Sequence, residues 1–129
     1  GICMLKKEGI ITAIITARSS EIVKKRASDL DIDHVYQGMK NKLNALQDLM
    51  KIYKINYSEI AYVGDDDPDI CVLEKVGLAF CPVDAIDRVK KICHFVSKKQ
   101  GGKGAVREIA EFIISSKKQV LETSDSIIA

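Results

Sequence analysis

The chain has 129 residues, 47% of them hydrophobic, which is enough to form one domain with a single core. Its 20 basic and 18 acidic residues give a net charge of +2 and are spread along the chain, which argues against a nucleic-acid-binding stripe. No apolar run approaches the ~18 residues that a membrane span needs. The four cysteines form no CxxC pair and suit buried thiols in a reducing compartment, so we expect a cytoplasmic protein.

The spacing of apolar residues predicts helices and strands that alternate along the chain. In chain order, we predict a helix over 2–7 closed by Gly9, a strand over 10–16, a helix over 19–30, a strand over 34–36, a helix over 42–53 and a strand over 60–63. A helix over 68–76, a strand over 77–81, a helix over 84–93, a strand over 95–96, a flexible loop over 101–104 and a helix from 105 to about 121 follow. We expect one domain over 1–117 and a frayed tail over 118–129.

This alternation predicts an α/β fold: a Rossmann-like parallel sheet with helices on both faces. Ligands bind such sheets beyond the carboxyl ends of the strands. Three predicted strands end in loops that carry polar and charged residues, at 16–18, 37–42 and 65–69. We therefore expect Thr16, Lys42 and Asp65 to lie at one edge of the sheet.

Four carboxylates stand close together in Asp65-Asp66-Asp67-Pro68-Asp69, directly behind an apolar run. Like charges at this density must be hydrated, protonated or neutralised by a cation. Mg²⁺ prefers oxygen ligands, so convergent carboxylates suit it. Alternatively, Asp67 caps a helix, Pro68 is the first residue of that helix, and the negative charge of Asp69 interacts favourably with the helix dipole. That alternative leaves Asp65 and Asp66 unexplained.

The other candidate residues also have two interpretations each. Thr16 could contribute its hydroxyl to an anion cradle at a helix N-terminus or could simply cap that helix. Arg18 could hold a phosphate or carboxylate through its planar fork, or it could be a solvated side chain. Lys42 stands at a loop-to-helix junction, but Lys40 is equally basic and composition does not choose between them.

A threonine, then a lysine, then an acidic cluster, each after a strand, resembles three motifs of the haloacid dehalogenase-like hydrolase superfamily. Within it, six segments resemble the 3-deoxy-D-manno-octulosonate 8-phosphate phosphatase family, namely 14–18, 34–38, 41–43, 61–66, 74–78 and 101–108. The last of them, Gly101-Gly102-Lys103-Gly104-Ala105-Val106-Arg107-Glu108, is the most specific, because the superfamily at large does not share it.

The resemblance implies a Mg²⁺-dependent phosphomonoesterase of the cap-less type that acts as a homotetramer on a phosphorylated sugar acid, a lipopolysaccharide precursor. By this analogy Asp65 would bind the metal, and Asp66 and Asp69 would orient it or its waters. Thr16 would hydrogen-bond the transferred phosphoryl group, and Lys42 would neutralise its charge.

The same resemblance places further residues near the substrate. Arg18 would lie close to it, and the glycine-rich segment would bring Lys103 and Arg107 to the active site of a neighbouring subunit. Two residues depart from the pattern: Ala17 stands where many members have glycine, and Lys103 where many have arginine. A lysine keeps the charge but loses the bidentate geometry of arginine.

One motif of the family does not occur in this chain: an Asp-x-Asp-Gly sequence that supplies the nucleophile and the general acid/base. Relative to that family the chain looks N-terminally truncated, so we expect it to be inactive by itself and to bind Mg²⁺ weakly. The strand before this motif would lie between the strands at 10–16 and 60–63. Without it, the chain must close the gap, pair with another chain or stay partly unfolded.

Two other functions stay open at this point. A nonulosonate 9-phosphate phosphatase would show the same resemblance. A non-catalytic tetramerisation domain, like the phosphatase-like region of some acylneuraminate cytidylyltransferases, would explain the absent nucleophile. A phospho-acceptor receiver domain does not fit, because receivers begin with the acidic pair and end with the lysine, whereas here the lysine comes first.

Overall fold

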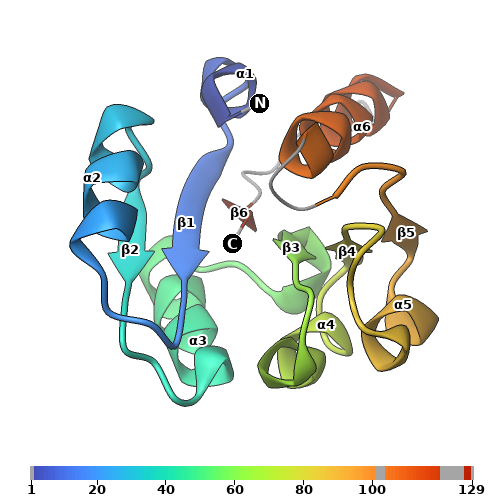
Figure 1. Ribbon diagram of the computed structural model, residues 1–129. Coiled ribbons are helices and arrows are strands. Elements are labelled where there is room, and N and C mark those ends of the chain that lie inside the picture. Colours follow the sequence, from blue (N-terminus) through green and yellow to red (C-terminus); the bar gives the residue numbers. More distant parts are fainter. Residues whose placement is uncertain (1, 101–103, 120–126, 129) are drawn as a thin grey trace.

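The computed structural model describes residues 2–100, 104–119 and 127–128, which form one six-stranded sheet with helices (Figure 1). The helices are α1 (Ile2–Lys7), α2 (Glu21–Asp29), α3 (Lys42–Tyr53), α4 (Ile70–Leu73), α5 (Asp87–Ile92) and α6 (Val106–Gln119), with 3-10 turns η1 (Tyr57–Glu59) and η2 (Asp67–Asp69). The strands are β1 (Ile11–Ile15), β2 (His34–Tyr36), β3 (Ile60–Val63), β4 (Leu78–Cys81), β5 (Phe95–Val96) and β6 (Ile127–Ile128). Their order is β2-β1-β6-β3-β4-β5 and every pairing is parallel, which confirms the predicted fold class.

Helices cover both faces of the sheet because successive strand residues point to opposite sides. One core lies under α3, α4 and α5, where Tyr62 packs in a cluster with Leu46 and Val72. The other lies under α1 and α6, where Ala61 joins a cluster that contains Leu5 and Ile109. The adjacent residues Ala61 and Tyr62 of β3 thus belong to different cores.

Local capping sets where the helices before the site begin and end. The side chain of Asn41 accepts hydrogen bonds from the first backbone amides of α3. The residue that follows the helix, Lys54, has a left-handed conformation that ends it. The predicted bounds of this helix, 42–53, are therefore confirmed. The predicted helix over 68–76 is instead the turn η2 followed by the single-turn helix α4, and Gly77 then donates its N–H to the carbonyl of Tyr57 at 2.8 Å.

The centre of the sheet contains a strand that the sequence analysis did not predict. Ile127 of β6 lies between Ile11 and Ile60, and Ile128 lies between Thr12 and Ala61. The chain thus closes the expected gap between β1 and β3, but only along part of their length. Beyond β6, the carboxyl-terminal residues of β1 pair with β2, and those of β3 pair with β4.

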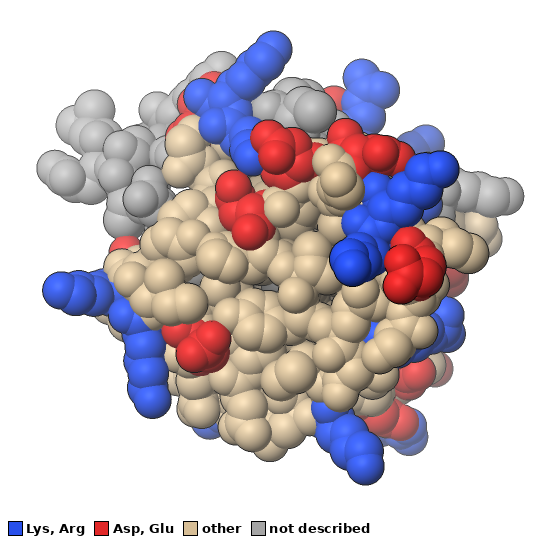
Figure 2. All heavy atoms as spheres, turned by 90° about the vertical axis from the view of Figure 1, so that its left-hand side faces the viewer, with Lys and Arg blue, Asp and Glu red and all other residues tan. Residues whose placement is uncertain are grey.

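The remaining expectations concern the tail and the surface. Residues 101–103, within the predicted flexible loop, lie outside the described residues, as does 120–126 of the predicted frayed tail; the domain boundary at 117 stays a prediction. No helix in the described ranges is long and apolar enough to cross a bilayer. On the face shown in Figure 2, basic and acidic side chains lie mostly around a broad uncharged centre, and no continuous basic stripe crosses it.

Candidate active site

A cavity of about 570 Å³ opens at the carboxyl ends of β1 and β3. Thr16, Lys42 and Asp65 all line it, which confirms the prediction that they lie at one edge of the sheet. The remaining lining residues are Ile14, Ala17, Arg18, Val23, Arg26, Asp66, Pro68 and Asp69. Lys40 is not among them, so of the two lysines only Lys42 lines the cavity.

Asp69 is the centre of the hydrogen-bond network in this cavity, although its side chain is almost fully buried, with 3% relative exposure for the residue. Its Oδ1 accepts hydrogen bonds from Lys42 Nζ at 2.8 Å and from the hydroxyl of Tyr62 at 2.7 Å. Its Oδ2 accepts the backbone N–H groups of Asp65 at 3.0 Å and Asp66 at 3.3 Å. A buried carboxylate requires such partners, and here they fix both Lys42 and the acidic loop.

The acidic loop, residues 64–69, can take this shape because of two local features. A Cβ atom on Gly64 would lie 2.5 Å from Cβ of Asp69, so only glycine permits this approach. Asp66 accepts the N–H of Asp67 at 2.7 Å and begins the turn, with Pro68 at its start. The alternative in which Asp67 is the cap is wrong, because Asp66 takes that place.

The two carboxylates at the ends of the loop have opposite electrostatic environments. Partial burial, and next the charge of Asp69, raise the pKa of Asp65 above its usual value, with smaller contributions from Asp66 and Asp84. Burial alone would also raise the pKa of Asp69, but the hydrogen bonds from Lys42 and Tyr62 and the Asp65 amide together hold it below its usual value. Asp69 therefore stays charged through its protein partners, whereas a bound cation would stabilise the charged form of Asp65.

The loop after β1 is organised by different contacts. Thr16 Oγ1 accepts the N–H of Arg18 at 3.1 Å, and the backbone of Thr16 exchanges hydrogen bonds with Tyr36 and Met39 of the next strand and loop. The alternative in which Thr16 caps the following helix is wrong, because Ser20 caps α2. The guanidinium of Arg18 is exposed and forms no ion pair with the described residues.

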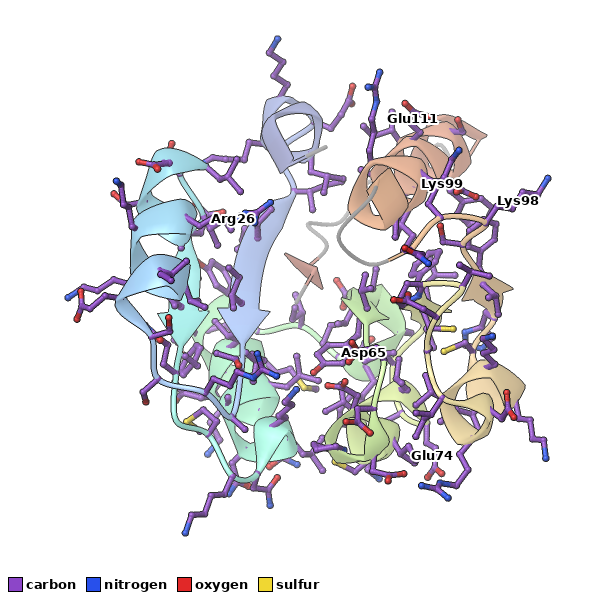
Figure 3. The ribbon with its side chains drawn as sticks, in the orientation of Figure 1. Arg26, Asp65, Glu74, Lys98, Lys99 and Glu111 are labelled. Carbon is purple, nitrogen blue, oxygen red and sulfur yellow. The ribbon has the colours of Figure 1, made fainter. Side chains whose placement is uncertain are left out.

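Three residues of the site were missed by sequence reasoning. Tyr62 stands within an apolar run and packs in the core, but its hydroxyl binds Asp69, and burial and that carboxylate raise its pKa. Asp84 follows β4 and does not line the cavity, but its charge contributes to the raised pKa of Asp65. The rule that selected the other strand ends could have found it. Arg26 lines the cavity from α2, and its side chain extends toward β1 (Figure 3); its helical position gave no signal.

The described part of the glycine-rich motif, residues 104–108, does not line this cavity. Lys103 lies outside the described residues. Arg107 Nε donates to Glu111 Oε1 at 3.3 Å on the exposed side of α6. Figure 3 shows Glu111 beside α6 at the top of the view, whereas Asp65 lies near its middle. The assignment of Lys103 and Arg107 to a neighbouring subunit's site stays a prediction.

The oxygen donors of the loop suit Mg²⁺ only in part. Asp65 and Asp66 are exposed at the cavity, and the carboxylate of Asp65 accepts no hydrogen bond from the described residues. Both oxygens of Asp69 are already engaged, so it suits an orienting role better than direct coordination. Across the described ranges, no three acidic, histidine or cysteine side chains converge closely enough to hold a metal ion. Mg²⁺ usually keeps several water molecules and needs only one or two carboxylates, so Asp65 alone fits such an ion.

Comparisons with known proteins agree with this geometry. A family model for haloacid dehalogenase-like hydrolases matches residues 32–109. The 3-deoxy-D-manno-octulosonate 8-phosphate phosphatase KdsC of Escherichia coli K12 is 41% identical over 112 residues, which are 87% of this chain and 59% of that protein. The protein of the same name from Salmonella typhimurium is 40% identical over 114 residues, 88% of this chain and 61% of that one. The chain thus spans about three-fifths of the length of these relatives.

Solved structures of octulosonate 8-phosphate phosphatases also match this chain. The 3-deoxy-D-manno-octulosonate 8-phosphate phosphatase of Moraxella catarrhalis, in complex with magnesium, phosphate and KDO, matches with a TM-score of 0.88 and 39% identity. The match covers 92% of this chain and 68% of that one. The cobalt-bound phosphatase of Haemophilus influenzae matches with a TM-score of 0.85 and 35% identity, over 95% of this chain and 72% of that one.

Proposed function

Because the chain belongs to the haloacid dehalogenase-like hydrolases, within the family of the 3-deoxy-D-manno-octulosonate 8-phosphate phosphatases, we propose that its cavity serves Mg²⁺-dependent hydrolysis of a phosphorylated sugar acid. One observation carries the proposal: the carboxylate of Asp69 accepts hydrogen bonds both from Lys42 and from the backbone amides of Asp65 and Asp66. A cation, a hydroxyl and a carboxylate then face one cavity, as the binding of a phosphate group and a metal ion requires.

Each residue has a separate task in this proposal. Lys42 neutralises charge on the phosphoryl oxygens, and its ion pair with Asp69 holds the ammonium group in place. Thr16 donates its hydroxyl to the phosphoryl group. Asp65 binds Mg²⁺, with Asp66 and Asp69 orienting the loop around it. When bound, Mg²⁺ would stabilise the charge that develops on phosphoryl oxygen.

The substrate follows from the relatives. These relatives are phosphatases of 3-deoxy-D-manno-octulosonate 8-phosphate, and the structure of the one from Moraxella catarrhalis contains magnesium, phosphate and KDO. We propose the same substrate for this chain, with a nonulosonate 9-phosphate as the alternative. Because the cavity contains Arg18 and Arg26 as well as Lys42, it offers cations for a carboxylate and for a phosphate.

We expect negligible hydrolysis by the 129-residue chain itself, because it contains no Asp-x-Asp-Gly sequence to supply a nucleophile. Loss of a nucleophile removes several orders of magnitude in rate. The measurement is release of inorganic phosphate from 3-deoxy-D-manno-octulosonate 8-phosphate with and without Mg²⁺. Metal-dependent turnover that Asp65→Asn abolishes would show that a carboxylate of this chain attacks phosphorus.

Binding tests the site without requiring turnover. Inorganic phosphate with Mg²⁺ should shift the backbone amide NMR signals of Thr16, Lys42 and Asp65 in a saturable way. Lys42→Met should weaken this binding, whereas Lys40→Met, which removes an exposed charge outside the cavity, should leave it unchanged. Equal effects of the two variants would contradict the assignment of Lys42.

A second candidate, a non-catalytic assembly domain, is favoured by one observation, the absence of the Asp-x-Asp-Gly sequence. In both cases we propose a homotetramer in the cytoplasm, where Cys71, Cys81 and Cys93 stay unpaired thiols, as they are here. Sedimentation measures the oligomer. An assembly domain would form a tetramer and bind no phosphate, which distinguishes it from the phosphatase.

A further inference from the structure

Helix α5 contacts the acidic loop from outside the cavity through an ion pair. Arg88 Nε donates to Asp67 Oδ1 at 3.0 Å, and Arg88 Nη2 donates to Asp67 Oδ2 at 2.7 Å. The two side chains are 70% and 53% exposed, so the pair adds little to the stability of the fold. A bidentate pair nevertheless fixes the orientation of both groups better than a single contact does.

A second contact joins the same two segments. The backbone N–H of Ile86, immediately before α5, donates to the carbonyl oxygen of Asp65 at 3.2 Å. Asp69 holds the loop from the buried side, through the amides of Asp65 and Asp66. The loop is therefore held on both sides, and Arg88 supplies the only ion pair on its outer side among the described residues.

The position of Asp67 matters to its neighbour. The N–H of Asp67 donates to Asp66 Oδ1 at 2.7 Å, so a fixed Asp67 directs the carboxylate of Asp66. Asp66 lines the cavity and Asp67 does not. The Arg88 pair thus keeps the carboxylate of Asp67 out of the cavity and holds the carboxylate of Asp66 in place.

We propose that Arg88, acting through Asp67, is a positioning residue that holds Asp65 and Asp66 in the arrangement that accepts one divalent cation. The cation is Mg²⁺, and to this extent the inference rests on the proposed function. Arg88 itself does not line the cavity, so its role is exerted through Asp67.

A simple effect of charge predicts a different pattern. Loss of the arginine charge would leave the loop more negative and tighten Mg²⁺ binding, loss of the aspartate charge would weaken it, and loss of both would restore the parent affinity. Positioning predicts that either loss weakens binding, and that the double variant is no weaker than the single ones, because one contact is broken in all three.

The experiment is an NMR titration of the chain with MgCl₂, followed at the amides of Gly64, Asp65 and Asp66. Arg88→Gln and Asp67→Asn should each weaken Mg²⁺ binding by about tenfold, the low end for groups that orient metal ligands. The double variant should match them, and Lys91→Gln, an exposed charge on the same helix, should have no effect. Opposite effects of the two single variants, or a double variant equal to the parent, would overturn the proposal.

A metal-free measurement separates this inference from the proposed function. If Mg²⁺ shifts no amide of the parent chain, the proposed function fails. The hydrogen exchange of the Ile86 amide, which binds the Asp65 carbonyl, then decides the inference: it should speed up equally in Arg88→Gln and Asp67→Asn at unchanged melting temperature. Unchanged exchange in both variants would overturn the positioning role.

Discussion

The loops after β3 and β1 meet at one cavity but are held in different ways. In the loop after β3, the buried carboxylate of Asp69 accepts four hydrogen bonds from side chains and amides around it. In the loop after β1, the hydroxyl of Thr16 accepts one N–H, and the guanidinium of Arg18 is exposed without an ion pair in the described chain. The acidic half of the site is thus organised by the fold alone.

The difference follows from burial. A charge that folding removes from water must find partners within the protein, and those partners then fix the surrounding backbone. A hydroxyl or guanidinium at the surface keeps its water and stays available to a ligand. We therefore expect loss of the buried Asp69 carboxylate to lower stability, and loss of the Thr16 hydroxyl to weaken ligand binding.

The largest expected effect comes from Asp69→Ala, which removes one partner of a buried ion pair and leaves Lys42 Nζ and the Tyr62 hydroxyl without their acceptor. The free energy of unfolding should fall by about 3–5 kcal/mol, measured by urea denaturation. The matched control is Asp65→Ala in the same loop, where no hydrogen bond to the side chain is lost, and its stability should not fall. Equal losses for both would remove the distinction between fixed and available carboxylates.

Gly64→Ala tests the close approach within the acidic loop. The added methyl group would lie 2.5 Å from Cβ of Asp69, so the loop must shift, at a cost of about 1–3 kcal/mol. As a control, Gly9→Ala has open space around the new methyl group and only the strain of its φ of +76°. A chemical denaturation series with Gly64→Ala no less stable than Gly9→Ala would contradict the argument from packing.

The pH dependence of stability should have opposite signs for the two carboxylates. The contribution of Asp69 is fully present above the usual pKa near 3.8 and is lost as the pH falls through its lowered pKa. The charged form of Asp65 instead opposes folding above its raised pKa, since burial and Asp69 disfavour it. Asp65→Asn should therefore increase the free energy of unfolding at pH 7 by less than about 1 kcal/mol, because the side chain is exposed.

This gain should shrink as the pH falls through the raised pKa of Asp65 toward 3.8, because the wild-type carboxyl then becomes neutral as well. Thermal denaturation of both proteins over this pH range measures it. Asp87→Asn, an exposed carboxylate in the first turn of α5, should show no such gain. A stability increase that does not depend on pH would show that charge is not its cause.

The smallest effect on stability should follow Thr16→Val, within about 0.5 kcal/mol, since it removes one exposed hydrogen bond. Phosphate affinity should nevertheless fall by about tenfold, the loss of a hydrogen bond to a charged group. Calorimetry with inorganic phosphate and Mg²⁺ compares the variant with the parent. Lower stability with unchanged phosphate binding would reverse the contrast between the two loops.

Short-range patterns were sufficient to predict most elements. The bounds of α3 at Lys42–Tyr53 and of β2 at His34–Tyr36 were predicted because periodicity and capping act within a few residues. The predicted helix over 68–76 was too long, since contacts between Gly77 and the distant Tyr57 end it. The cavity edge was predicted from topology, because parallel strands present all their carboxyl ends on one side.

The sequence by itself determined the parallel α/β fold, the three loops of the site and the choice of Thr16 and Asp65, because each rests on local residue types and their order. Only the tertiary structure showed that Lys42 and not Lys40 lines the cavity, gave Tyr62 a polar partner, joined Arg88 to Asp67 and placed β6 between β1 and β3. These contacts connect residues far apart in the chain. No local pattern specifies them, because they depend on which surfaces packing brings together.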